Sequence, residues 1–149
     1  MARVFVEMGD LESAVAVREA ATADGHDVEM VESPAEVESR LRSADEEMAL
    51  VLTGMLDETV SSQGSGAFAG AIPRPPLLAV VPENDPVELH RIARLFDVDE
   101  AISAPPDPVE VQVALRTQLD RYRLQAETGI VGRTEAIREV LDRIQLIAP

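Results

Sequence analysis

The chain has 149 residues, of which 46% are hydrophobic and 28% charged, a composition that fits one globular domain with an appendage. Its formal net charge is -15, since 28 Asp and Glu residues outnumber 13 basic residues, all of them Arg, so direct binding to the phosphates of a nucleic acid is not expected. No apolar run is long enough to span a bilayer and cysteine is absent, so we expect no membrane span, no disulfide and a cytoplasmic location.

The first part of the chain alternates strand and helix patterns. Residues 3–6 are β-rich, and Asp10 is the expected cap of the helix that follows. A second strand is predicted over residues 28–31. Ser33 and Glu36 have the spacing of a capping box and predict a helix that runs to about residue 41.

The second part continues the alternation. Residues 48–52 and 77–81 are apolar throughout, as in strands that are buried on both faces. The glycines and serines between these two strands predict a short or irregular third helix, or a loop. Pro86 opens the next helix, residues 100–103 form a fifth strand, and a long helix begins at Pro108.

This order of elements predicts an α/β fold with a doubly wound, flavodoxin-like parallel sheet of five strands, a shortened or irregular third helix and a C-terminal linker helix. We divide the chain into three parts. Residues 1–107 form the α/β core, residues 108–127 form an extended fifth helix and linker, and residues 128–149 form a separate C-terminal segment.

The order of elements over about residues 2–124, with Ala104 and Pro105 after the fifth strand, resembles the CheY-like receiver domain of bacterial response regulators. The resemblance implies the strand order 2-1-3-4-5. In receivers two acids that bind Mg²⁺ end the first strand, and an aspartate that accepts the phosphoryl group ends the third. A Ser or Thr ends the fourth strand, and a Lys-Pro pair follows the fifth. The metal and the lysine neutralise charge on the transferred phosphoryl group.

Aligned with that pattern, the sequence has lost nearly every residue of the phosphorylation site. Glu7 falls on the first acid, but Met8 replaces its neighbour. Thr53 falls on the acceptor, Val81 on the switch hydroxyl and Ala104 on the lysine. One carboxylate makes a poor Mg²⁺ site, because hard cations require several oxygen ligands. The resemblance therefore implies a pseudo-receiver, with no enzymatic activity, metal or cofactor expected.

Three polar side chains have simple structural interpretations. The Thr53 hydroxyl is expected to bond to nearby backbone, and the alternative is a site for a serine/threonine kinase. His26 and His90 are isolated in sequence from each other and from acid–base partners, and His90 is expected at the surface.

The long helix also has the spacing of a coiled-coil seam. Leu115, Leu119, Tyr122 and Ala126 are separated by 4, 3 and 4 residues and predict a homodimer. Packing of the first half of the helix on the sheet explains Leu115 equally well.

Residues 129–149 resemble the entry to the AAA+ ATPase domain of sigma-54-dependent transcription activators of the nitrogen-regulation type. The resemblance depends on a Val-Gly turn followed by a helix that ends in Ala-Pro. In that family the turn packs near the adenine, which implies that Ile130, Val131 and Gly132 are close to the nucleotide if the ATPase domain is present. The sequence contains no Walker A loop, so we expect a chain cut before it and assign no ATP binding.

The leading hypothesis is a regulatory domain that works without phosphorylation. It would control an attached ATPase, and through it sigma-54 RNA polymerase, by protein contacts and dimerisation. The alternative is a small-molecule sensor that uses the crevice at the strand ends. The acidic, lysine-free composition resembles that of halophile proteins, although a strongly solvated surface explains it equally well.

Overall fold

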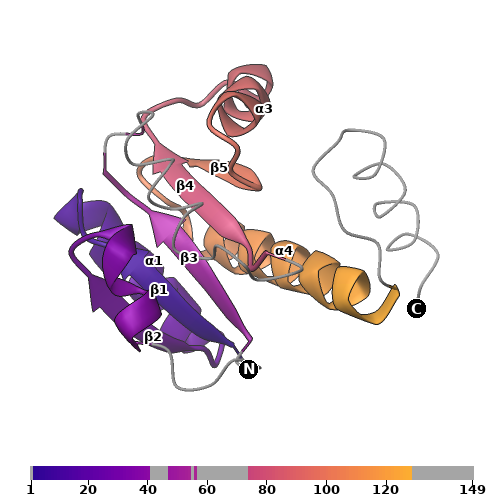
Figure 1. Ribbon diagram of the computed structural model, residues 1–149. Coiled ribbons are helices and arrows are strands. Elements are labelled where there is room, and N and C mark those ends of the chain that lie inside the picture. Colours follow the sequence, from indigo (N-terminus) through magenta and orange to yellow (C-terminus); the bar gives the residue numbers. More distant parts are fainter. Residues whose placement is uncertain (1, 41–46, 55, 57–73, 129–149) are drawn as a thin grey trace.

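The computed structural model describes residues 2–40, 47–54, 56 and 74–128 (Figure 1). Strands and helices alternate along this part of the chain. In chain order they are β1 (Arg3–Glu7), α1 (Leu11–Ala23), β2 (Asp27–Val31), the 3₁₀ turns η1 (Pro34–Glu36) and η2 (Glu38–Arg40), β3 (Met48–Leu52), β4 (Leu77–Val81), α3 (Pro86–Leu95), β5 (Glu100–Ser103) and α4 (Pro108–Thr128).

The five strands form one parallel sheet in the order β2-β1-β3-β4-β5, as the resemblance implied. Every residue of β1, β3 and β4 is buried, whereas most of the edge strand β2 is partly exposed. This burial explains why the central strands are apolar without alternation: both faces of the sheet are covered.

Alternate side chains of each strand enter two separate cores. Val4 and Val6 of β1 pack with α1 and α4 on one face of the sheet. Phe5 packs on the other face with Val37, next to the 3₁₀ turns, and Ala93 of α3. The predicted doubly wound arrangement is therefore present, since successive side chains of a strand point to opposite faces and both faces hold helical elements (Figure 1).

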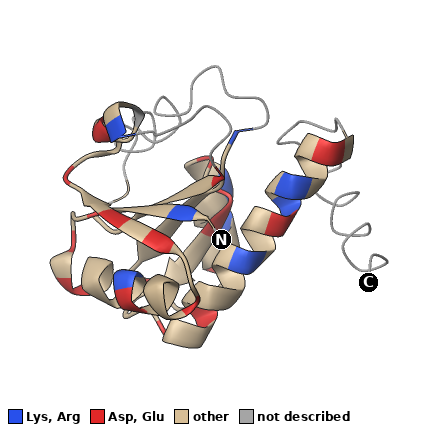
Figure 2. Cartoon of the chain, turned by 90° about the horizontal axis from the view of Figure 1, so that it is seen from below, with Lys and Arg blue, Asp and Glu red and all other residues tan. Residues whose placement is uncertain are grey.

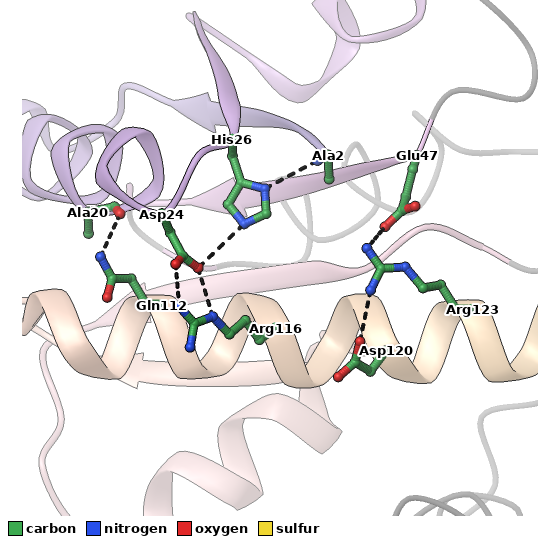
Figure 3. A network of polar contacts seen from close by, with 9 residues as sticks. All are labelled: Ala2, Ala20, Asp24, His26, Glu47, Gln112, Arg116, Asp120 and Arg123. Carbon is green, nitrogen blue, oxygen red and sulfur yellow. Dashed lines mark hydrogen bonds and ion pairs between the residues drawn. The ribbon is translucent and has the colours of Figure 1, made fainter. Parts of the chain in front are cut away.

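A polar network joins the end of α1 to the middle of α4 (Figure 3). Arg116 of α4 binds both carboxylate oxygens of Asp24, with Nε at 2.9 Å from Oδ2. Gln112 adds a hydrogen bond from its amide to the carbonyl of Ala20 at 3.0 Å. The hydrogen bond from Arg116 holds the pKa of the Asp24 carboxyl below its ordinary value. The two helices that share one face of the sheet are thus tied to each other as well as to the core.

His26 lies in the same network, so the expectation that it has no acid–base partner is wrong. Its side chain is 8% exposed, its Nε2 lies 3.8 Å from Oδ2 of Asp24, and its Nδ1 accepts a hydrogen bond from the amide of Ala2 at 3.3 Å. Burial lowers the pKa of the imidazole, and Asp24 opposes that shift. His90 is exposed on α3, as expected.

The helix predicted from the capping box is also absent. Residues 34–40 form two 3₁₀ turns instead of an α-helix. Ser33 makes no capping bond, and Oε2 of Glu36 accepts from the amide of Glu32, one residue before the expected position. The Glu36 side chain and the local backbone therefore close a 3₁₀ turn in place of the predicted α-helix. The third helical segment was expected between residues 53 and 76, and most of it lies outside the described residues.

The described helices differ in how firmly they are held. Five residues of α1 and six of α4 are buried, but only Ala93 of α3 is. The C-terminal end of α4 extends beyond the sheet (Figures 1 and 2). In the part of the chain that the structure describes, no helix is both long and apolar enough to cross a bilayer.

Candidate functional site

The carboxyl ends of parallel strands meet at one edge of the sheet, and the positions singled out from the sequence gather there. Thr53, Val81 and Ala104 follow or end β3, β4 and β5, and they line one pocket. Glu7, at the end of β1, bonds to Thr53 from behind this pocket. Met8 points elsewhere and packs against the core beneath α1 and α4. Four of the five positions thus lie together.

Thr53 is a buried residue whose hydroxyl already has partners. It is 4% exposed, and its Oγ1 donates to the carbonyl of Glu7 at 2.5 Å. The same oxygen lies 3.2 Å from the amide of Asp10, from which it accepts. These bonds join the end of β3 to the loop after β1. They confirm that the hydroxyl bonds to nearby backbone, and the burial argues against attack by a protein kinase.

The Glu7 carboxylate faces the protein backbone. It is 7% exposed, and Oε1 accepts hydrogen bonds from the amides of Thr53 at 2.9 Å and Gly54 at 2.8 Å. A carboxylate in this position satisfies two amides that the end of β3 leaves without a ladder partner. Asp10 is exposed, and its Oδ2 accepts a hydrogen bond from the hydroxyl of Ser13 in the first turn of α1. Among the described residues no group of three or more His, Asp and Glu is placed to hold a metal ion.

Two glycines allow this close packing. A Cβ on Gly9 would lie 2.4 Å from both the Cα of Gly54 and Oε2 of Glu7. Such contacts are far shorter than atoms tolerate, so any larger residue would push the β1–α1 loop away from β3. Gly9 therefore permits the Thr53–Glu7 contact, and nothing in the sequence pattern singled it out.

The rest of the site is an apolar pocket of about 450 Å³. Val81 and Ala104, which the resemblance aligns with the hydroxyl and the lysine of receivers, are joined by a hydrogen bond from the Ala104 amide to the Val81 carbonyl at 2.8 Å. The Ala104–Pro105 peptide bond is cis. The remaining lining residues come from the loops at the strand ends and from α3: Gly9, Asp10, Thr53, Gly54, Leu56, Val80, Pro82, Ile92 and Phe96.

The part of the pocket formed by α3 was missed in the sequence. Ile92 and Phe96 are one helical turn apart, so they share a face, and this spacing is the signal that could have located it. Leu95, the last residue of α3, is exposed. The glycine- and serine-rich stretch between β3 and β4, predicted as a short helix or a loop, lies outside the described residues.

The candidate dimerisation residues divide into two groups. Leu115 and Leu119 are 0% and 1% exposed and pack in the core with α1 and the sheet. Tyr122 is half-buried and Ala126 is exposed. A seam that uses all four would require both leucines to leave the core, so the alternative explanation of Leu115 as a sheet contact is the correct one. Ile130, Val131 and Gly132 lie outside the described residues.

No protein-family model and no curated protein matches this sequence. Solved structures do match. A CheY-like receiver domain protein from Methanospirillum hungatei JF-1 has a TM-score of 0.61 at 13% identity, over 84% of this chain and 98% of that one. A two-component response regulator from Clostridium difficile has a TM-score of 0.60 at 12% identity, over 82% of this chain and 98% of its own.

A longer protein also aligns. NtrX from Brucella abortus, in complex with ADP, has a TM-score of 0.67 at 13% identity. The match covers 100% of this chain and 36% of the NtrX chain. Together these similarities show that the chain has the CheY-like, flavodoxin-like fold of response-regulator receiver domains.

Proposed function

We propose that this chain is a non-enzymatic regulatory domain that keeps the receiver fold and works without phosphorylation. The observation that supports this most directly is the buried Thr53 hydroxyl, which stands at the acceptor position and is already bonded to Glu7 and Asp10. An unactivated hydroxyl in this environment is a poor nucleophile. Val81 and Ala104 add no group that could stabilise a phosphoryl transition state.

The regulated partner, in this proposal, is an attached AAA+ ATPase of the sigma-54-dependent, nitrogen-regulation type in the cytoplasm. Two observations support it: the similarity of the whole chain to part of NtrX, and the resemblance of residues 129–149 to the entry of such a domain. Contacts made by α4 and the segment after it would carry the signal to the ATPase, and from there to sigma-54 RNA polymerase. Ile130, Val131 and Gly132 would then lie near its nucleotide.

The proposed dimer uses the C-terminal half of α4. Tyr122 and Ala126 remain available there, whereas Leu115 and Leu119 belong to the core. This half extends beyond the sheet, and it has Arg, Asp and Glu residues along its length (Figure 2). Residues of both signs flanking an apolar stripe are typical of paired helices.

Incubation with acetyl phosphate and Mg²⁺, followed by intact-protein mass spectrometry, tests the independence from phosphorylation. We expect no phosphorylated species under conditions that fully label an ordinary receiver domain. Thr53→Asp should also remain unlabelled, because it restores neither the second acid at Met8 nor the lysine at Ala104. Stoichiometric, Mg²⁺-dependent labelling of the natural chain would overturn the proposal.

Control of an ATPase is tested in the protein that continues past residue 149. Deleting residues 1–107 should change the rate of ATP hydrolysis, and acetyl phosphate should leave the rate of the undeleted protein unaltered. A rate that is indifferent to the deletion would show that the domain does not regulate the enzyme.

A further inference from the structure

The pocket at the strand ends has the size of a ligand site. Its volume of about 450 Å³ lies within the range of about 300–1,000 Å³ typical of small-molecule sites. It is walled on one side by the ends of β3 and β4 and on another by Ile92 of α3 and by Phe96, the residue that follows this helix. The crevice beyond the carboxyl ends of the strands is also where ligands bind in sheets of this topology.

The chemistry of the walls is unusual for a protein with a net charge of -15. Among the described residues that line the pocket there is no Arg or His, and the one acidic residue, Asp10, has its Oδ2 bonded to Ser13. The carboxylate of Glu7 is turned away into the amides of Thr53 and Gly54. The Thr53 hydroxyl is saturated by Glu7 and Asp10.

The residues that line the pocket disfavour a ligand with a charge of either sign. An anion would enter without a cationic partner and against the negative field of the whole chain. A cation would meet a single carboxylate among the described lining residues, that of Asp10, and would otherwise lose hydration against the apolar wall of Val81, Ile92 and Ala104. An uncharged apolar molecule meets neither cost and gains by removing apolar surface from water.

We propose that this pocket binds a small, uncharged, predominantly apolar molecule, and that such a ligand is the input signal of the domain. The inference rests on the proposed function. If the domain works without phosphorylation, a ligand at the same edge of the sheet would take the place of the phosphoryl group as the signal. The aromatic ring of Phe96 offers a face or edge for a ring in the ligand.

The position of α3 explains how occupancy would be transmitted. Only Ala93 of this helix is buried, so α3 has few contacts that fix its orientation. A ligand in the pocket touches Ile92 and Phe96 and therefore adds apolar contacts to the least anchored of the described helices. Binding should hold α3 against β5 and change the surface that these two elements present.

A pair of probes that differ in one group tests the site. N-phenyl-1-naphthylamine is uncharged, and 8-anilinonaphthalene-1-sulfonate has the same ring system with a sulfonate. Fluorescence titration of the whole chain should give saturable, one-to-one binding of the uncharged probe. The sulfonate should bind at least about tenfold more weakly, a difference of about 1.4 kcal/mol or more.

Matched variants locate the binding. Ala104→Leu fills the pocket and should weaken the uncharged probe at least about tenfold. Ala35→Leu makes the same change at an exposed alanine of η1 and should leave its affinity unaltered. If Ala104→Leu fails to fold by circular dichroism, Ile92→Asp, at a half-exposed position, should give the same loss by adding a charge. Hydrogen exchange of α3 should slow when the uncharged probe binds.

Three results would overturn the inference: no saturable binding of the uncharged probe, equal affinity for both probes, or unchanged affinity in the folded pocket variants. Failure of the proposed function would be seen in the phosphorylation experiment and not in the probe titrations. Labelling by acetyl phosphate would contradict independence from phosphorylation whatever the probes do, and absence of probe binding would leave regulation by protein contacts intact.

Discussion

The hydroxyl of Thr53 ties the end of β3 to the loop that follows β1. It donates to the carbonyl of Glu7 in a buried bond and accepts from the amide of Asp10 in a partly buried one. Removing the hydroxyl leaves a buried carbonyl and an amide without their partner. The residue at the acceptor position is thus part of the framework of the fold.

Thr53→Val, which keeps the shape but not the hydroxyl, should lower the free energy of unfolding by about 1–3 kcal/mol. Urea denaturation followed by circular dichroism measures this change. Thr53→Ser keeps the oxygen and is the matched control. Its free energy of unfolding is expected to fall much less. If both variants lose the same amount, the methyl group and not the hydroxyl stabilises the site.

His26 gives the protein a dependence on pH in the weakly acidic range. Its burial lowers the pKa of the imidazole below the ordinary value of 6.5. Asp24 partly compensates, while Arg123 adds repulsion. The folded protein therefore binds this proton at a lower pH than the unfolded chain does.

Between the lowered pKa and 6.5 the unfolded chain takes up more protons than the folded one, so stability is full above pH 6.5 and falls as the pH drops below it. His26→Gln should flatten this part of the curve of unfolding free energy against pH. His90→Gln, at an exposed position, should leave the slope as it is. An unchanged slope in His26→Gln would assign the acid sensitivity to carboxylates alone.

At the scale of elements, apolar strands were the most reliable sequence signal. Runs such as residues 48–52 and 77–81 are buried on both faces, so composition alone identified them. The segment after Ser33 was harder, because a capping box is a local pattern and the chain closes two 3₁₀ turns there instead. The spacing of Leu115 and Leu119 was ambiguous for another reason: a heptad stripe and a face that packs on a sheet look the same over two turns.

Buried and more exposed positions in the C-terminal half of α4 should respond differently to replacement of the side chain by Ala. Leu119→Ala removes a fully buried side chain and should destabilise the fold by about 2–5 kcal/mol in urea denaturation. Tyr122→Ala, at a half-buried position beyond it, should cost less stability. It should instead weaken self-association, which sedimentation equilibrium measures. A monomeric natural chain, or a dimer indifferent to Tyr122→Ala, would contradict the proposed role of this half of the helix.

At the scale of the whole molecule, the sheet topology followed from the order of elements, but the character of the site did not. The resemblance to receivers predicted that catalytic groups are missing at Met8, Val81 and Ala104. It did not show that Glu7 turns into the backbone, or that Gly9 allows the loop to approach β3, because both depend on contacts between segments distant in sequence. The apolar pocket likewise arises only when α3 is placed against the strand ends.

The net charge of -15 predicts how stability depends on salt. Repulsion among 28 acidic residues opposes folding, and the 13 Arg residues can offset less than half of it. Exposed pairs such as Arg91–Glu88 lose strength in salt, but each contributes only about 0–1 kcal/mol. Relief of the repulsion should therefore outweigh the weakening of the ion pairs.

The melting temperature should accordingly rise with KCl and then level off as the Debye length falls to about 3 Å at 1 M. Differential scanning calorimetry in KCl measures the rise, and sucrose at matched osmolality is the uncharged control, which should not reproduce its steep early part. A rise that continues linearly above about 1 M would instead indicate salt exclusion from the surface. A melting temperature that falls with KCl would mean that the Arg ion pairs stabilise the fold more than the acidic surface opposes it.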